Sequence, residues 1–283
     1  MIDTSLIDIQ HVTYTYPVRD GKATPALCDV SLKIAQGEYV ALLGHNGSGK
    51  STLARHCNAL LLPDSGRVLV SGLDTRETIH HRAIRDQIGM IFQNPDNQII
   101  ATIVEDDVAW ALSVRGVAAS VIRERVTEAL EAVGLSEMRR YPPHRLSGGQ
   151  RQRLAIAGLL ALRPRCIIAD EATSMLDPLS RREIVGLLHH LHRRFNLTII
   201  HVTHLLEEVI EAERIIIMEK GSIVMQGTPS HIFADLARLR SLKLVIPPPI
   251  ELAACLRAAG YMLPAEALSI EAIADAIGQG VSY

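Results

Sequence analysis

The sequence has few cysteines and no long apolar run, and each absence argues against a class of protein. The cysteines form none of the close pairs that bind metal or act in redox motifs, so reduced thiols are expected. No apolar stretch approaches the roughly 18 residues that a membrane-spanning helix needs. The amino-terminal segment MIDTSLIDIQH lacks a basic stretch followed by an apolar one, so the chain is expected to stay in the cytosol. The four cysteines are Cys28, Cys57, Cys166 and Cys255.

An excess of charge of one sign is also absent. The 283 residues carry 29 Lys and Arg against 31 Asp and Glu, a formal net charge of -2, which argues against a generally polybasic nucleic-acid coat. The composition is that of an ordinary globular protein, with 48% hydrophobic and 21% charged residues. The length suits one large domain or two domains of roughly 100 to 200 residues each.

Short apolar segments divided by turn residues predict strands in the first 70 residues. IDIQHVTYTY, LCDVSLKI, EYVALLG and GRVLVSG have this form. After the third segment, Leu53, Cys57 and Leu60 share one helical face. The middle of the chain predicts a separate helix over 121–133 that stops at Gly134.

From Arg151 the pattern alternates between helix and strand. RQRLAIAGLLAL, LSRREIVGLLHHLHRRF and the stretch after HVTH predict helices, and CIIADE, LTIIHVTH and RIIIMEKGSIVMQG predict strands. Such alternation is typical of parallel strands joined by helical crossovers.

The composition changes after about residue 241. Three consecutive prolines at 247–249 predict a linker. Two short helices are predicted to follow, the second capped by Ser269 and stopped by Gly278. Because this pair is too small to fold alone, we expect it to dock on the rest of the molecule.

The segment GHNGSGKS at 44–51 matches the phosphate-binding pattern G-x-x-x-x-G-K-[ST]. It follows the apolar strand YVALL and opens a helix, which is the context that the pattern requires. In such a loop the backbone N–H groups wrap a polyphosphate, Lys50 neutralises the terminal phosphates and Ser51 ligates magnesium. An accidental glycine-rich turn is the alternative, and the flanking strand and helix argue against it.

Two adjacent carboxylates, Asp170 and Glu171, end the apolar strand CIIADE. In a phosphoryl-transfer site the first would hold magnesium through water, and the second would act as general base on the attacking water. Two acids after a strand can also form a solvent-facing cap. The phosphate loop earlier in the chain favours the catalytic interpretation.

A second anion-binding helix end is predicted in LSGGQRQR at 146–153. Ser147 can cap the following helix, and Gly148 and Gly149 allow its amino terminus to approach an anion closely. One nucleotide does not need both helix ends from one molecule.

With these motifs in this order, the chain resembles an ABC-type ATPase subunit over about 6–227. GHNGSGKS corresponds to the Walker A loop, LSGGQ to the signature, CIIADE to the Walker B strand, SMLD at 174–177 to the D-loop and His204 to the switch histidine. Ala169 stands where a larger aliphatic residue is common, which is expected to affect packing more than chemistry. The stretch IGMIFQNPDNQIIATIVEDDVAWAL resembles the ATPases of energy-coupling factor transporters, which import vitamins and cobalt or nickel, and the tail at 247–277 points the same way.

The resemblance implies an α/β fold of the P-loop NTPase class, with a RecA-like core. To this core it adds an antiparallel β subdomain, an α-helical insertion and a small C-terminal helical extension. It places the ATPase domain at 1–240, with a helical subdomain at about 96–150, and the extension at 241–283. It also implies that two subunits face head to tail, with each ATP between the Walker A loop of one subunit and the signature of the other.

Further roles follow from the same resemblance. Ser147 and Gly149 would touch the γ-phosphate bound by a partner, and Asp177 would connect the two sites. His204 would hold the phosphate and the catalytic water, whereas His201 is expected to be a satisfied polar residue at a strand end.

The resemblance implies a role for Tyr16, which fits the place of the family's adenine-stacking aromatic residue better than Tyr14, and the position of Gln93 suggests a second role. Tyr16 is expected to stack on adenine, although an aromatic residue in a strand more often belongs to the core. Gln93 is long enough to ligate magnesium or the attacking water, and its loop would relay the nucleotide state to a bound partner.

The candidate site residues fall into three groups. The catalytic candidates are Glu171, His204 and Gln93; the metal candidates are Ser51, Gln93 and Asp170; the nucleotide-binding candidates are Tyr16, Gly44, His45, Asn46, Gly47, Ser48, Gly49, Lys50, Ser51, Thr52, Ser147, Gly148, Gly149, Gln150 and Asp177.

Trp110 and a run of arginines each have more than one interpretation. Trp110 either anchors a membrane partner or lies in the core. Seven arginines occur between Met138 and Ala169 without one acidic residue. Nucleic-acid binding is conceivable for them, but counter-charge for a partner's phosphate and a solvated helix face account for much of the run, so no nucleic-acid partner is expected.

The predicted function is hydrolysis of Mg-ATP at the cytoplasmic face of a membrane complex, which powers import of a vitamin or transition-metal ion. The expected partners are a second ABC ATPase subunit, a transmembrane scaffold and a substrate-capture subunit. One alternative is a soluble ABC ATPase of nucleic-acid repair or translation, but two nucleotide domains or a long coiled coil are not visible here. Another is a partner subunit that does not hydrolyse ATP, and the intact Glu171 and His204 argue against it.

Overall fold

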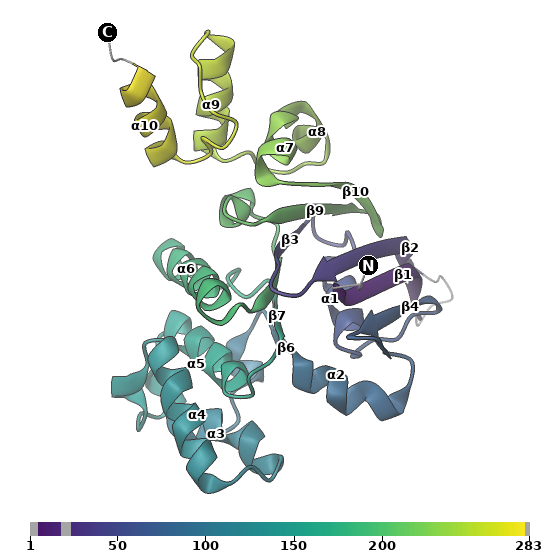
Figure 1. Cartoon of the computed structure of the whole chain (residues 1–283), viewed down its shortest axis with the longest axis vertical. Helices are drawn as coiled ribbons and strands as arrows, with labels where there is room; N and C mark the ends of the chain where they lie inside the picture. The colour runs from purple at the N-terminus through teal and green to yellow at the C-terminus, as the bar shows by residue number, and fades with distance from the viewer. Residues whose placement is uncertain (1–4, 18–23, 281–283) are drawn as a thin grey trace.

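The computed structural model describes residues 5–17 and 24–280, and its strands form two sheets (Figure 1). A four-stranded antiparallel sheet has the order β2-β1-β4-β5, and a six-stranded sheet has the order β10-β9-β3-β8-β7-β6. The strands are β1 Ser5–Tyr16, β2 Thr24–Ala35, β3 Tyr39–Leu43, β4 Ser65–Val70, β5 Leu73–Asp74, β6 Ile88–Ile91, β7 Cys166–Asp170, β8 Thr198–Val202, β9 Arg214–Glu219 and β10 Ser222–Gly227.

The six-stranded sheet is parallel from β9 to β6, as the alternating pattern predicts. RIIIMEKGSIVMQG, predicted as one strand, instead forms the antiparallel pair β9 and β10, because it turns at Lys220 and Gly221, which both have positive φ. Every residue of β3, β7 and β8 is buried, because a parallel sheet is covered on both faces. Successive residues of these strands enter different hydrophobic clusters: Leu43 and Ile167 belong to one, and Leu42 and Ile168 to the other. The period-2 alternation of a strand thus divides the core into two layers.

Two groups of helices lie at opposite ends of this sheet. In Figure 1, α3, α4 and α5 lie together at the β6 end, and α7 to α10 lie beyond β10 at the other end. Within the described residues, no helix combines the length and apolarity of a membrane span. The helices are α1 Lys50–Cys57, α2 His81–Gln87, α3 Val104–Val114, α4 Ala119–Ala132, α5 Gly148–Leu160, α6 Pro178–Phe195, α7 Pro229–Ala234, α8 Leu236–Ser241, α9 Pro248–Ala258 and α10 Ile270–Gly280, and the 3-10 turns are η1 Thr78–His80, η2 Pro95–Asn97, η3 Ser136–Met138, η4 Pro143–Arg145 and η5 Leu206–Val209.

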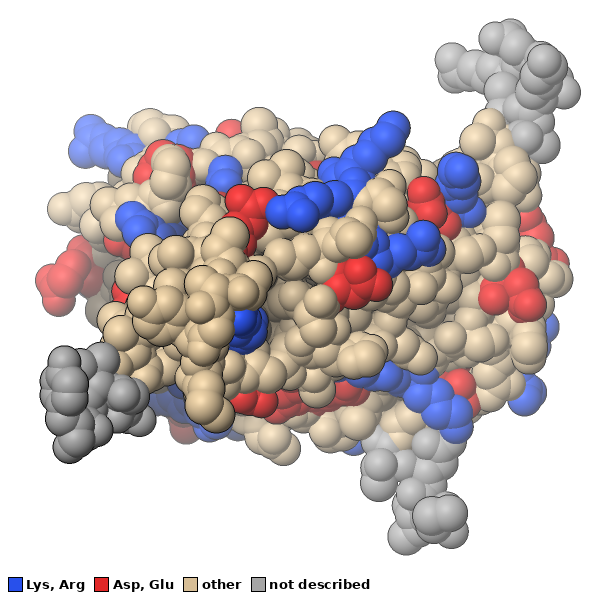
Figure 2. Space-filling view, turned by 90° about the horizontal axis from the view of Figure 1, so that it is seen from above, with Lys and Arg blue, Asp and Glu red and all other residues tan. Residues whose placement is uncertain are grey.

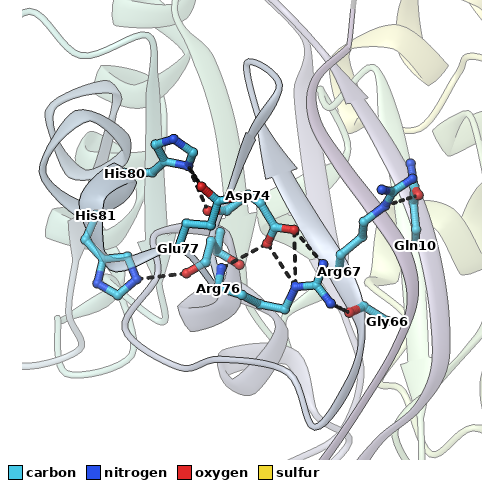
Figure 3. Close-up of polar contacts among 9 residues, drawn as sticks. Gln10, Gly66, Arg67, Asp74, Arg76, Glu77, His80 and His81 are labelled. Atoms are coloured by element: carbon cyan, nitrogen blue, oxygen red, sulfur yellow. Dashed lines mark hydrogen bonds and ion pairs between the residues drawn. The ribbon is translucent and has the colours of Figure 1, made fainter.

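Polar contacts join the antiparallel sheet to the segment that leads into α2 (Figure 3). The Arg76 guanidinium donates to both carboxylate oxygens of Asp74 and to the carbonyl of Gly66. This hydrogen bond lowers the pKa of Asp74. His81 Nε2 lies 2.8 Å from the Thr75 carbonyl oxygen and holds the start of α2 against the β5 turn.

Four other details of the predicted elements are also wrong. The first helix ends at Cys57, so Leu60 lies outside it and is 44% exposed. The stretch after HVTH forms only the short turn η5 instead of a helix. The prolines at 247–249 open α9, because proline has the backbone angle of a first helical turn and needs no N–H partner there. The last helix continues past Gly278.

The C-terminal segment packs on the rest of the molecule, as expected for a pair too small to fold alone. Leu244, Ile246, Ile250 and Leu268 belong to the main hydrophobic cluster, which also contains strand residues of the six-stranded sheet. A small cluster of Ala253, Ala267 and Ile273 joins α9 to α10. The extension is therefore held by one shared core and one local core.

Ile250→Ala tests the shared core. Ile250 is 2% exposed, so we expect its truncation to lower the free energy of unfolding by about 2–5 kcal/mol. The control Leu252→Ala, at a position 46% exposed on the same helix, should change it by about 0.5 kcal/mol or less. Chemical denaturation followed by circular dichroism measures both. An equally small change in both variants would show that the extension does not share the main hydrophobic core.

Candidate functional site

The phosphate loop joins β3 to α1 in a conformation that requires glycine. Gly44 and Gly49 have φ of 149° and 104°. A Cβ at Gly44 would lie 2.4 Å from the Met218 carbonyl oxygen, and one at Gly49 would lie 2.5 Å from the Ala26 carbonyl oxygen. The glycines are thus needed for the backbone angles and for close packing against neighbouring chain segments.

Lys50 lies inside this loop and is 3% exposed. Its Nζ donates to the carbonyl oxygens of Gly44 at 2.8 Å and His45 at 3.1 Å, and it lies 3.9 Å from Glu171 Oε1. Burial lowers the pKa of Lys50, and the Glu171 and Asp170 carboxylates oppose this effect. The ammonium group is held where phosphate oxygens would enter the loop.

Ser51 and Asp170 bring two oxygens together between α1 and the end of β7. Ser51 Oγ donates to Asp170 Oδ1 at 2.6 Å. Burial raises the pKa of Asp170, and the bond from Ser51 opposes the shift. Hydroxyl and carboxylate oxygens are ligands that Mg²⁺ prefers, so the donor set fits this ion. Among the described residues no hydrogen bond or ion pair brings Gln93 to this pair.

Glu171 follows directly in a left-handed backbone conformation, with φ of 51°. Its N–H donates to the Val202 carbonyl at 3.0 Å, and its own carbonyl accepts from Ser174 Oγ at 2.9 Å. A left-handed non-glycine residue persists only where its surroundings hold it. The turn aims the carboxylate towards Lys50 on the phosphate loop.

The predicted signature forms a capped helix start away from the phosphate loop. Ser147 and Gln150 make a reciprocal capping box at the start of α5. A Cβ at Gly149 would lie 3.0 Å from Ser180 Oγ, so this helix end packs on the first turn of α6. Asp177 caps α6 through the N–H groups of Leu179 and Ser180. No hydrogen bond or ion pair of the described residues joins 147–150 to 44–52.

The two histidines at the end of β8 differ in burial. His201 is fully buried, and its Nδ1 lies 3.1 Å from the Tyr39 hydroxyl. His204 is partly exposed, and its buried Nδ1 has no hydrogen-bond partner. Of the two, only His204 is partly exposed at this edge of the sheet, and its role in binding phosphate stays a prediction.

Tyr16 lies beside the start of α1. Its hydroxyl is 3.2 Å from Thr52 Oγ1, and its ring packs edge-to-face on Tyr14 with centroids 5.0 Å apart. Tyr14 also packs on His56 of α1. Tyr14 also packs against the hydrophobic core, and the stacking of Tyr16 on adenine stays a prediction.

The loop after β6 carries Gln93 as an exposed residue. Gln98, which the sequence analysis did not single out, braces the loop by accepting from the Phe92 N–H and donating to the Met90 carbonyl. Asp96 pairs with Arg151 of α5 at 3.0 Å. The Gln93 loop is thus tied to the signature helix, and no sequence motif indicated this link.

Ion pairs are found for four of the seven arginines in the arginine-rich segment. Several of its arginines pair with acids from distant parts of the chain, as do Arg139 with Glu105 and Arg163 with Glu128. Figure 2 shows basic and acidic side chains interspersed over the face it presents. Trp110 is 49% exposed, so it is not a core residue.

The C-terminal segment also contributes to the surroundings of the site. A cavity of about 310 Å³ is lined by His45 and Asn46 of the phosphate loop, by 204–207 and by 243–248. No sequence motif indicates that 243–248 lies beside the phosphate loop. Its neighbours in the cavity are three residues predicted to bind or act on the nucleotide.

Comparisons with known proteins find similar sequences and similar folds. Residues 27–174 match the family described as ABC transporter. The energy-coupling factor transporter ATP-binding protein EcfA1 of Clostridium novyi is 48% identical over 98% of this chain and 99% of its own, and that of Symbiobacterium thermophilum is 50% identical over 95% of each. The solved structure of CbiO1 from Clostridium perfringens, part of the ABC transporter complex CbiONQ, has a TM-score of 0.77 and 33% identity over 89% of this chain and all of its own. An ATP-binding cassette solved as a post-hydrolysis dimer with ADP and phosphate has a TM-score of 0.71 and 31% identity over 79% of this chain and 98% of its own.

Gly49→Ala and Gly47→Ala form a matched test of the loop. Both positions have positive φ, but a Cβ at Gly47 meets no heavy atom within 4 Å. Without nucleotide, we expect Gly47→Ala to lower the free energy of unfolding by about 1–2 kcal/mol through backbone strain alone. Gly49→Ala should cost more, because the Ala26 carbonyl must also move. Equal losses in urea denaturation would contradict the close packing described above.

Proposed function

The chain belongs to the ABC transporter family, as an ATP-hydrolysing subunit of the energy-coupling factor type, and from this we propose that two such subunits close around Mg-ATP and thereby drive import of a vitamin or transition-metal ion. The proposal is supported most by the separation of two phosphate-binding helix ends. Among the described residues, the phosphate loop at the start of α1 and the capped start of α5 make no polar contact with each other. Each is complete as half of a site and needs the other half from a second subunit.

In the proposed site, the phosphate loop binds the polyphosphate of ATP. Its N–H groups and the amino terminus of α1 supply positive potential, and Lys50 donates to the terminal phosphates in place of the loop carbonyls. Ser51 and Asp170 would hold Mg²⁺, with Gln93 as a further ligand. When bound, the ion neutralises charge on the phosphate oxygens.

Hydrolysis then requires a water molecule in line with the terminal phosphate. We assign Glu171 as the general base that accepts a proton from this water. His204 holds the terminal phosphate with its partly exposed ring. The partner's signature brings Ser147 and Gly149 to the γ-phosphate, and Asp177 connects the two sites across the interface.

The remaining parts of the proposal concern partners and location. The ATPase would lie at the cytoplasmic face of the membrane, bound to a transmembrane scaffold that carries a substrate-capture subunit. The Gln93 loop and the exposed Trp110 offer the contact with the scaffold. The Asp96–Arg151 ion pair joins that loop to the signature helix. A movement of one would displace the other.

Glu171→Gln is the direct test of hydrolysis. It removes the base and keeps the size of the side chain, so we expect ATP turnover to fall by about 10²–10⁴-fold while ATP still binds. The control Glu137→Gln, at an exposed position on η3, should turn over ATP at the normal rate. Release of phosphate and binding of a fluorescent ATP analogue give the two readouts. Equal turnover in both variants would remove Glu171 as the base.

The same variant tests closure. With Mg-ATP and the natural second subunit present, Glu171→Gln should elute as a dimer in size-exclusion chromatography, since the nucleotide is trapped between the two halves. ADP should not produce this dimer, because it lacks the terminal phosphate that both halves bind. Persistence of the monomer in ATP at every concentration would refute the sandwich arrangement.

A further inference from the structure

A buried polar cluster lies on one face of the six-stranded sheet, near the candidate site. It consists of Tyr39 on β3, His201 on β8, Glu208 on η5 and Thr173 in the loop after β7. The Tyr39 hydroxyl lies 3.1 Å from His201 Nδ1, His201 Nε2 lies 3.2 Å from Glu208 Oε2, and Thr173 Oγ1 donates to Glu208 Oε1 at 2.7 Å. All four residues are at most 4% exposed.

The protonation of this cluster follows from its contacts. Burial raises the pKa of Tyr39, so its hydroxyl keeps a proton that it can donate to His201 Nδ1. On the other side of the His201 ring, Nε2 lies beside Glu208 Oε2. Burial by itself would raise the pKa of Glu208, but its contacts with His201 and Thr173 outweigh this effect and hold the pKa below its ordinary value. Glu208 is therefore a buried carboxylate that depends on its partners for its charge.

Glu208 connects the two segments that carry the proposed catalytic groups. Thr173 is two residues after Glu171, and Glu208 is four residues after His204. The Arg181 Nε of α6 lies 3.7 Å from Glu208 Oε1, close to the helix start that Asp177 caps. Without the carboxylate, the turn at Glu171 and the segment after β8 would be joined near this point mainly by the Glu171–Val202 backbone bond.

We propose that Glu208 is a positioning residue, which sets the relative placement of Glu171 and His204 through its bond to Thr173 and its contact with His201. The inference rests on the proposed roles of Glu171 and His204. Glu208 itself lies too deep to touch nucleotide. Its effect is on the geometry of the hydrolysis step, because catalytic groups must stand close to their productive positions.

Thr173 offers the cleanest test because it can be changed at nearly constant volume. Thr173→Val removes the hydroxyl that donates to Glu208, and Thr173→Ser keeps it. We expect Thr173→Val to lower kcat by roughly 10- to 100-fold, since a displacement of about 1 Å can cost about 10²-fold. The KM for ATP and the affinity for a fluorescent ATP analogue should stay within about twofold, because the phosphate loop is untouched. Thr173→Ser should restore most of kcat.

Tyr39→Phe tests the far end of the cluster and guards against misfolding of the first variant. It removes the hydroxyl facing His201 and leaves the ring stacked on His189 at 4.2 Å. We expect a severalfold loss in kcat with an unchanged KM, at the wild-type unfolding midpoint or slightly below it. Far-ultraviolet circular dichroism and thermal unfolding identify the folded variants.

The outcomes separate this proposal from the proposed function. A folded Thr173→Val or Tyr39→Phe with wild-type kcat would overturn the positioning role. So would a Thr173→Ser variant as slow as Thr173→Val, or a loss confined to ATP affinity. Normal turnover of Glu171→Gln would instead refute the assignment of the base, whatever the Thr173 variants do.

Discussion

The backbone ladder that joins β3, β8 and β7 is the constraint on which the site depends. Parallel strands in register end at one edge of their sheet, so the phosphate loop, the Asp170–Glu171 pair and His204 emerge from neighbouring points. Apolar side chains cover both faces of this ladder and fix its register. A slip of one residue in any strand would turn its side chains to the opposite face and displace the loop that follows it.

Burial of charge is the second common feature. Lys50, Asp170 and Glu208 are all withdrawn from water, and each has polar partners that compensate for the lost hydration. In such surroundings a small displacement of a partner changes electrostatic interactions strongly. Preorganised polar groups of this kind are what a phosphoryl-transfer site requires, because little covalent chemistry is left for the protein to perform.

The C-terminal extension packs into the same core and lies beside the candidate site. Its apolar residues join the main core, while 243–248 line a cavity shared with His45, Asn46 and His204. At the opposite end of the sheet, the Asp96–Arg151 pair ties the Gln93 loop to the signature helix. Both ends of the molecule thus have direct physical connections to groups that we propose to bind nucleotide.

The sequence by itself determined the chemistry and the local structure of this protein. GHNGSGKS, CIIADE and LSGGQ identify their own turns and caps, because glycine conformations and helix capping are decided within a few residues. Strand and helix alternation likewise indicated the parallel sheet. Only the tertiary structure decided which distant groups meet: Ser51 with Asp170, the arginine-rich segment with its acids, and His201 with Glu208. Such contacts depend on how buried surfaces pack together, and the pattern of residues along the chain does not indicate which distant segments will pack.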